Sequence, residues 1–148
     1  MRASGILMPI SSLPSPCGIG AMGAAARQFA DFLVAGGQSY WQILPICPTS
    51  YGDSPYQSFS AYAGNPYFID LDDLAAEGLL EGSEYRELDW GDEPEYVDYG
   101  LMYQRRYPVL KQAADRLLAA PPAEYQAFCA GSDWLEDYAL FMALKDKH

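Results

Sequence analysis

The first 46 residues alternate between short apolar runs and a helical pattern. Residues 4–10 form an apolar run that is bounded by turn-forming residues and has a proline near its end, which predicts a buried strand. Over residues 23–35 apolar side chains recur at helical spacing as far as a pair of glycines, which predicts a helix with one buried face. A second apolar run, residues 40–46, also has a proline near its end. The order strand, helix, strand predicts a right-handed βαβ unit with parallel strands.

The rest of the chain predicts helices and gives no clear strand. Residues 67–71 are expected to be briefly extended. Pro108 lies inside the longest apolar-periodic stretch and is expected to interrupt or kink that helix, because proline has no backbone N–H to donate. The pattern therefore predicts an α/β chain with a mostly helical second half. The expected helices are residues 70–82 with Asp70 as the cap, residues 97–120, residues 123–130 and residues 133–147.

The last predicted helix has no stop signal. No glycine, asparagine or proline follows it before the sequence stops at His148. We therefore expect this chain to be truncated.

The acidic charge of the chain is concentrated in one segment. The formal net charge is −11, and residues 72–98 hold eleven of the 20 acidic residues but only one of the nine basic ones. Such a run is most often a solvated face or loop. Its sign argues against binding to a nucleic-acid backbone, so we expect no nucleic-acid partner.

The cysteines and the histidine limit the cellular locations and the catalytic chemistry to be expected. Three widely spaced cysteines, Cys17, Cys47 and Cys129, favour reduced thiols and a cytoplasmic location. The only histidine is His148, so no internal imidazole is present to activate a serine or cysteine nucleophile. We expect no metal site. No run approaches 18 apolar residues, and no signal peptide opens the sequence, so we expect no membrane segment.

Residues 18–23, GIGAMG, fit the pattern G-x-G-x-x-G and open a predicted helix. The dinucleotide fingerprint needs its first glycine in the tight turn at the strand end and an acidic residue about 20 residues further on. Here a proline-containing loop separates the strand from the first glycine, and the second strand ends without an acid. We interpret these glycines as turn formers before a helix, and a dinucleotide enzyme remains an alternative that cofactor titration would test.

Residues 51–67, YGDSPYQSFSAYAGNPY, form a long stretch without helical or strand periodicity. Long irregular connections are usually functional or disordered, and five aromatic residues argue against disorder. The stretch begins just past the second predicted strand, at the edge where parallel α/β folds carry ligand sites. Tyrosine combines a flat apolar face with a hydroxyl, which suits sugars, and Ser54, Gln57 and Ser58 add uncharged polar groups.

Three residues are predicted to shape this loop. Gly52 allows backbone conformations that other residues resist, and Pro55 restricts the backbone. Asp53 can close an Asx turn onto the amides after it. Asp53 is also a candidate catalytic carboxylate, but glycoside chemistry needs two carboxyl groups and the sequence names no partner. We therefore favour a structural role for Asp53.

Six residues of the loop divide into two groups by their expected role. Packing against the rest of the protein is the favoured interpretation for Phe59, Tyr62 and Tyr67. Composition leaves packing and ligand contact equally open for Tyr51, Ser54 and Tyr56.

Four stretches of the chain closely resemble the N-terminal part of the 4-alpha-glucanotransferases (amylomaltases, disproportionating enzymes) of glycoside hydrolase family 77. The resemblance runs from about residue 3 to the end and is weakest in residues 81–96. The resemblance is specific because its central stretch, residues 36–71, is long and uninterrupted. The stretches are SGILMPISSLPSPCGIG, GGQSYWQILPICPTSYGDSPYQSFSAYAGNPYFIDL, VDYGLMY and DWLEDYALFMALK.

The resemblance implies a (β/α)8 TIM barrel with helical insertions. Residues 1–71 would supply the start of the barrel, with two strands, one helix and the aromatic loop, and residues 72–148 a mostly helical insertion. The implied activity is transfer of α-1,4-glucan segments between maltooligosaccharides or starch-like glucans by a retaining double displacement, without a cofactor. The family's aspartate nucleophile, glutamate acid/base and second aspartate would all lie beyond His148, so this chain alone should be inactive.

The resemblance also implies substrate-binding residues. Ser54 and Tyr56 match positions that line donor-side subsites near the cleavage point, and Tyr51 and Tyr103 match two tyrosines of a second glucan-binding groove. A stand-alone glucan-binding module that uses the same tyrosines without catalysis is the alternative.

Overall fold

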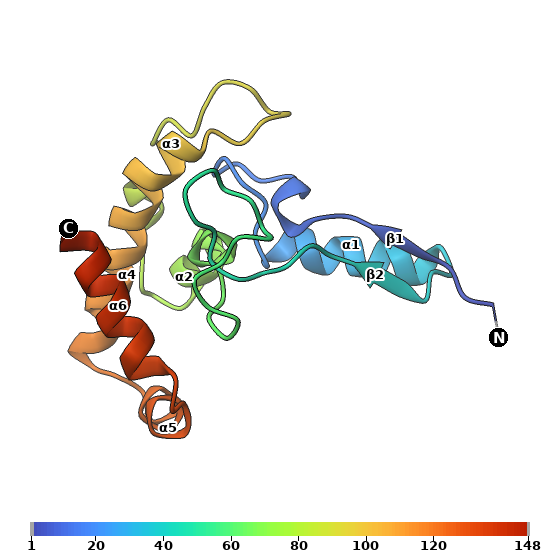
Figure 1. The fold of residues 1–148 in the computed structure, drawn as a ribbon. Helices are drawn as coiled ribbons and strands as arrows, with labels where there is room; N and C mark the ends of the chain where they lie inside the picture. The colour runs from blue at the N-terminus through green and yellow to red at the C-terminus, as the bar shows by residue number, and fades with distance from the viewer. Residues whose placement is uncertain (1, 148) are drawn as a thin grey trace.

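The computed structural model describes residues 2–147 as an extended arm joined to a helical body (Figure 1). The arm contains the first two strands and the first helix, and the body contains the other helices. A π-helical segment, Met102–Arg106, joins α3 to α4. The elements are β1 (Gly5–Leu7), α1 (Ala24–Ala35), β2 (Tyr40–Gln42), α2 (Leu71–Ala76), α3 (Tyr99–Leu101), α4 (Tyr107–Ala119), α5 (Ala123–Gly131) and α6 (Leu135–Lys147).

The two strands are parallel, as the order strand, helix, strand predicts. Gly5 pairs with Tyr40 and Leu7 with Gln42, and α1 forms the connection between the strands. Both strands are shorter than predicted, since β1 ends at Leu7 and β2 at Gln42. The prediction of a buried strand is wrong for these residues, since all three residues of β1 are exposed.

α1 is anchored to the strands by aromatic packing. The rings of Phe29 and Trp41 meet edge to face with centroids 5.0 Å apart, and the Trp41 indole donates to Met8 O at 2.8 Å. Ile10, Leu13 and Ala26 form a small core beneath this contact. The helix at residues 23–35 is therefore confirmed, and it ends at a glycine pair as predicted.

A larger core joins the first half of the chain to the helical body. It gathers residues from the glycine loop, the turn before α2, the acidic segment and the long helix. Two members, Tyr85 and Met102, are fully buried. The members are Cys17, Ile19, Tyr67, Leu71, Leu80, Tyr85, Trp90, Met102, Val109 and Ala113.

Arg106 lies inside this core and ties three segments together. It is 1% exposed, and its guanidinium donates to Cys17 O at 3.2 Å and to Ile69 O at 2.7 Å. The guanidinium also lies 6.0 Å from the Trp90 ring centroid. Its Nε has no hydrogen-bond partner among the residues that the structure describes. Burial lowers the pKa of this guanidinium from its usual value.

The long helix contains the distortion that Pro108 predicts. The chain is helical from Tyr99 to Ala119, and its π-helical segment lies just before the proline. Proline removes one intrahelical donor and crowds the preceding turn, which a wider π turn accommodates. The predicted end at the two prolines and the two following helices are confirmed.

Two predictions in the middle of the chain hold only in part. Ile69 and Asp70 are extended, as predicted for residues 67–71. Tyr67 and Phe68 instead belong to the 3-10 turn Pro66–Phe68, which Asn65 caps by accepting from Tyr67 N, and Leu71 begins α2. The helix that begins after Asp70 ends at Ala76 instead of continuing to Gly82. Gly78, two residues after Ala76, has φ 77°, a left-handed conformation in which the helix cannot continue.

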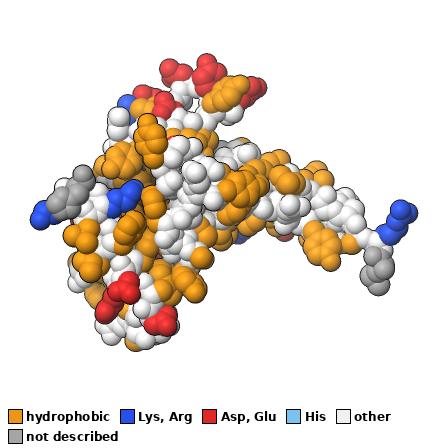
Figure 2. Space-filling model, viewed as in Figure 1, with side chains coloured by type: hydrophobic (Ala, Val, Ile, Leu, Met, Phe, Trp, Pro, Cys, Tyr) orange, Lys and Arg blue, Asp and Glu red, His pale blue; other side chains and the backbone are white. Residues whose placement is uncertain are grey.

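The acidic segment begins in α2, continues as a loop with one 3-10 turn, Gly82–Glu84, and is partly fixed by ion pairs. Acidic side chains gather at the upper edge of the molecule in Figure 2, over the loop that leads into α3. Asp72, Asp73, Glu84 and Asp89 each pair with an arginine at 2.6–2.9 Å. The hydrogen bond from Arg116 is the main reason that the pKa of Glu84 falls to about 2. The sequence predicts a solvated face or loop for this segment. The ion pairs add attachments between the segment and the rest of the protein.

Candidate functional site

The first half of the aromatic loop is closed on itself just past β2. Thr49 and Ser58 form an antiparallel bridge, and Ser50 N donates to Gln57 O at 3.1 Å. Inside this closure, Gln57 N donates to Ser54 O at 3.1 Å. Residues 49–58 are therefore a small hydrogen-bonded unit, which lowers the entropy lost when a ligand binds.

Two consecutive residues turn the loop in the left-handed region. Gly52 has φ 94° and Asp53 has φ 55°, and Asp53 is the one non-glycine residue with positive φ among residues 2–147. Aspartate is one of the few side chains that tolerates this conformation. The predicted shaping roles of Gly52 and Asp53 thus have a direct backbone basis.

The side chain of Asp53 does not make the predicted turn. No Asx turn onto the following amides forms, because Tyr56 N donates to Ser54 Oγ at 3.4 Å and residue 55 is a proline. The Asp53 carboxylate instead lies near Thr49. Partial burial raises the pKa of the Asp53 carboxyl above its usual value, although the neighbouring Thr49 hydroxyl opposes the shift.

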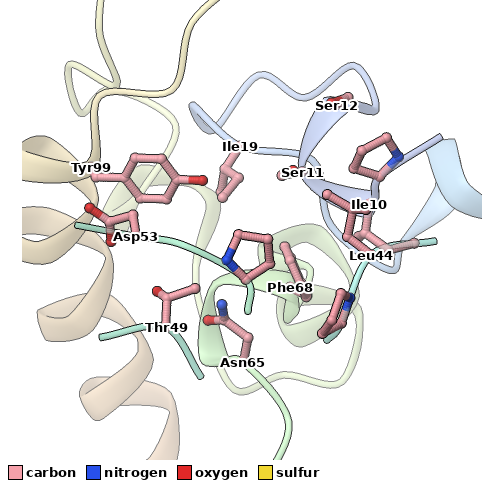
Figure 3. A pocket seen from close by; sticks show the side chains of 13 residues that line it. Ile10, Ser11, Ser12, Ile19, Leu44, Thr49, Asp53, Asn65, Phe68 and Tyr99 are labelled. Atoms are coloured by element: carbon pink, nitrogen blue, oxygen red, sulfur yellow. The ribbon is translucent and has the colours of Figure 1, made fainter. Parts of the chain in front are cut away.

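A cavity of about 250 Å³ lies beside this loop, past the carboxyl ends of both strands (Figure 3). Its walls combine apolar side chains with hydroxyl, amide and carboxyl groups, and Asp53 supplies the single carboxyl group of the lining. In Figure 3 the Asp53 carboxyl lies beside the Tyr99 ring, with Thr49 below. The lining residues are Pro9, Ile10, Ser11, Ser12, Ile19, Leu44, Pro45, Thr49, Asp53, Pro55, Asn65, Phe68 and Tyr99.

The sequence-predicted binding residues lie on exposed parts of two segments. Tyr51 is fully exposed, Tyr56 is 73% exposed, and Ser54 is half-buried between them. Tyr103 is 66% exposed on the π-helical segment, where its ring meets Tyr107 edge to face at 5.6 Å. These exposed tyrosine faces are free to stack on a ligand.

Phe59 and Tyr67 pack as predicted, and Tyr62 packs through one ring contact while it stays 75% exposed. Phe59 lies 5.7 Å from Phe141, and Tyr62 stacks on Trp134 at 5.9 Å, so both contact α6 or the turn before it. Tyr67 is buried against Tyr107 at 5.3 Å.

Sequence reasoning missed several polar residues of the cavity. Ser11 and Ser12 follow β1 just as the aromatic loop follows β2, and the strand-end rule that selected the loop applies equally to them. Thr49, Asn65 and Tyr99 reach the cavity only through tertiary packing, for which the linear sequence gives no signal.

The glycine pattern has a packing role. A β-carbon on Gly20 would lie 2.0 Å from Ile10 O, and one on Gly23 would lie 2.0 Å from the Asp70 carboxylate. Asp70 therefore fills the space at the start of α1 where a pyrophosphate would have to bind. The interpretation as turn-forming glycines is confirmed for Gly18, which has φ 77°, whereas Gly20 and Gly23 are required by close packing.

Two negative findings apply to the described part of the chain. Between residues 2 and 147, no three side chains of the metal-binding types gather closely enough to hold an ion. Over the same residues, no helix combines the length and apolar character needed to cross a bilayer.

The carboxyl ends of parallel strands, with apolar, aromatic and a few polar groups beside them, are a usual place for a ligand site in α/β proteins. The family model described as 4-alpha-glucanotransferase matches residues 8–148. The chain belongs to this family, glycoside hydrolase family 77.

Individual relatives agree with the family assignment. The chain is 51% identical over 141 residues to a 4-alpha-glucanotransferase of Clostridium butyricum, covering 95% of this chain and 29% of that protein. It is also 51% identical over 152 residues to one of Thermus thermophilus, covering 99% of this chain and 29% of that protein. A solved structure, amylomaltase from Streptococcus agalactiae in complex with acarbose, superposes with a TM-score of 0.95 at 46% identity, covering 99% of this chain and 30% of that one. The chain thus spans about 30% of the length of these relatives.

Proposed function

We propose that the protein containing this chain transfers α-1,4-glucan segments between maltooligosaccharides or starch-like glucans. The observation that carries the proposal is the match to 4-alpha-glucanotransferases at about 50% identity over almost the whole chain. The reaction is a retaining double displacement through a covalent glycosyl-enzyme. We also propose a cytoplasmic location, which the three unpaired cysteines support.

Residues 1–71 are proposed to begin a (β/α)8 barrel, and residues 72–148 to form a helical insertion. The parallel register of β1 and β2, with α1 as their connection, supports the first part. The helices from α2 to α6 support the second. In such a barrel the cavity beside Asp53 lies at the face where substrates bind.

This chain is proposed to bind glucan without cutting it. Retaining chemistry needs two carboxyl groups about 5–5.5 Å apart, and the cavity lining holds one, Asp53. The nucleophile, the acid/base and the stabilising aspartate are therefore proposed to come from later barrel strands. No cofactor is required by this mechanism.

Four residues are proposed to contact glucan. Ser54 and Tyr56 face the donor side near the cleavage point, and the exposure of Tyr56 supports stacking on a pyranose. Tyr51 and Tyr103 form a second groove, supported by their exposed rings. Gly52, Asp53 and Pro55 shape the loop that carries three of these residues.

Incubation of the full-length protein with maltotriose tests the proposed activity. We expect glucose together with maltooligosaccharides longer than maltotriose, measured by chromatography of the products. A stand-alone glucan-binding module would bind maltotriose and leave it unchanged. Binding without new products would therefore contradict the transferase and favour the module.

A further inference from the structure

Asn65 is a buried polar residue whose side-chain amide has a fixed orientation. The residue is 7% exposed, and its Oδ1 accepts from Tyr67 N at 3.0 Å, which caps the 3-10 turn Pro66–Phe68. Its own backbone N–H donates to Ile46 O at 2.8 Å. Because an amide NH2 group cannot accept a hydrogen bond from Tyr67 N–H, the oxygen lies on that side and the nitrogen, Nδ2, on the other.

The Asn65 nitrogen reaches the cavity beside the aromatic loop. Asn65 lines this cavity, and in Figure 3 its amide nitrogen points toward the middle of the lining side chains. Among residues 2–147, the hydrogen bond from Tyr67 N is the only one that the Asn65 side chain makes. Buried polar groups nearly always have a partner, so Nδ2 is a donor that a ligand in the cavity would satisfy.

The cavity offers the mixed chemistry of a sugar site. Ser11, Ser12 and Thr49 bring hydroxyl groups to its walls. Phe68 and Tyr99 bring aromatic rings. A pyranose has apolar C–H faces and hydroxyls that both donate and accept, so it can contact groups of both kinds. The volume of about 250 Å³ is below the about 300–1,000 Å³ of pockets for drug-sized ligands, so the cavity suits one sugar ring better than a chain.

The cavity adjoins the proposed glucan contacts. Asp53 and Pro55 line it, and these are the residues on either side of Ser54. A glucan bound at Ser54 therefore has the cavity next to it.

We propose that this cavity is a subsite for a single glucosyl unit, and that Asn65 binds the unit by donating from Nδ2 to one of its hydroxyls. The inference rests on the proposed function, because its ligand is the glucan. It adds a buried donor of fixed direction to contacts that are exposed or half-buried. The bond to Tyr67 N holds the amide before the sugar arrives, so little side-chain freedom is lost on binding.

Asn65→Ser in the full-length protein separates the donor from the cap. Serine is a good capping residue, so the turn should be kept, but its shorter side chain does not extend to the position of Nδ2. We expect kcat/KM for maltotriose transfer to fall about tenfold, as for one lost hydrogen bond to the substrate. Thermal melting checks that the variant remains folded. Gln126→Ser, which removes an exposed amide from α5, is the matched control and should leave kcat/KM unchanged.

Monodeoxy analogues of maltotriose, each lacking one hydroxyl, identify the contact on the substrate. In the wild type, the analogue that lacks the partner of Nδ2 should have a kcat/KM about tenfold below that of maltotriose. In Asn65→Ser the same analogue should lose no more than about twofold relative to maltotriose, because both changes remove the same bond. A purely structural role of Asn65 would instead lower kcat/KM for maltotriose and every analogue by one common factor.

Two results would overturn the subsite. These are an Asn65→Ser protein with the kcat/KM of the wild type, and analogues whose losses are the same in Asn65→Ser and the wild type. The assay also keeps this inference apart from the proposed function. If the wild type forms no transfer products from maltotriose, the proposed function fails and the subsite fails with it. If Asn65→Ser and the wild type form them equally well, only the Asn65 contact fails.

Discussion

Replacing Arg106 by methionine should lower the free energy of unfolding by about 3 kcal/mol. The substitution leaves the carbonyls of Cys17 and Ile69 buried without their donor, and each unsatisfied group costs about 1–3 kcal/mol. Methionine fills most of the volume and removes a buried charge, which offsets part of that cost. Urea unfolding of the full-length protein measures the change.

Two further variants identify the cause of the Arg106 effect. Arg106→Lys keeps the charge but lacks the planar fork that reaches both carbonyls, so an intermediate loss is expected. Lys111→Met removes an exposed charge from the same helix and should change stability by less than about 0.5 kcal/mol. An Arg106→Met protein as stable as the wild type would show that the three segments are held by packing alone.

Trimming Tyr56 to alanine should raise the ratio of hydrolysis to transfer about tenfold in the full-length protein. Transfer requires an acceptor sugar to outcompete water, and an aromatic side chain over the cleft excludes water from the glycosyl-enzyme. A tenfold change corresponds to about 1.4 kcal/mol, within the range of a stacking aromatic contact. Glucose release and chain-lengthened products from maltotriose give the ratio.

Tyr96→Ala is the matched control for Tyr56. Tyr96 is similarly exposed but lies on the acidic segment, away from the aromatic loop. Its removal should leave the ratio unchanged. If Tyr56→Ala and the wild type had the same ratio of hydrolysis to transfer, the proposed exclusion of water by Tyr56 would be contradicted.

The sequence predicts those elements whose signals are local. Apolar spacing and a glycine stop gave α1, and the aspartate cap gave the start of α2, because caps and periodicity act within a few residues. The end of α2 was missed because Gly78 and Gly82 are both plausible stops, and only the left-handed Gly78 is used. Pro108 predicted a distortion, while its π-helical form depends on how Met102 and Arg106 pack in the core.

The candidate site was predictable only in part. Loop composition and position after a strand left Tyr51, Ser54 and Tyr56 open as ligand contacts, and the family resemblance gave all three a binding role and added Tyr103. Asp53, Asn65 and Tyr99 line one cavity although they are separated along the chain, because they meet only through the fold. Arg106 carried no sequence signal, since an arginine in a helix is usually exposed.

A crystal structure of the full-length protein with acarbose tests most directly whether the aromatic loop binds glucan. The account predicts that the Ser54 hydroxyl lies within hydrogen-bond distance of the sugar, about 2.5–3.0 Å between oxygens, and that the Tyr56 side chain contacts it. Acarbose bound in the barrel with neither residue in contact would contradict the account.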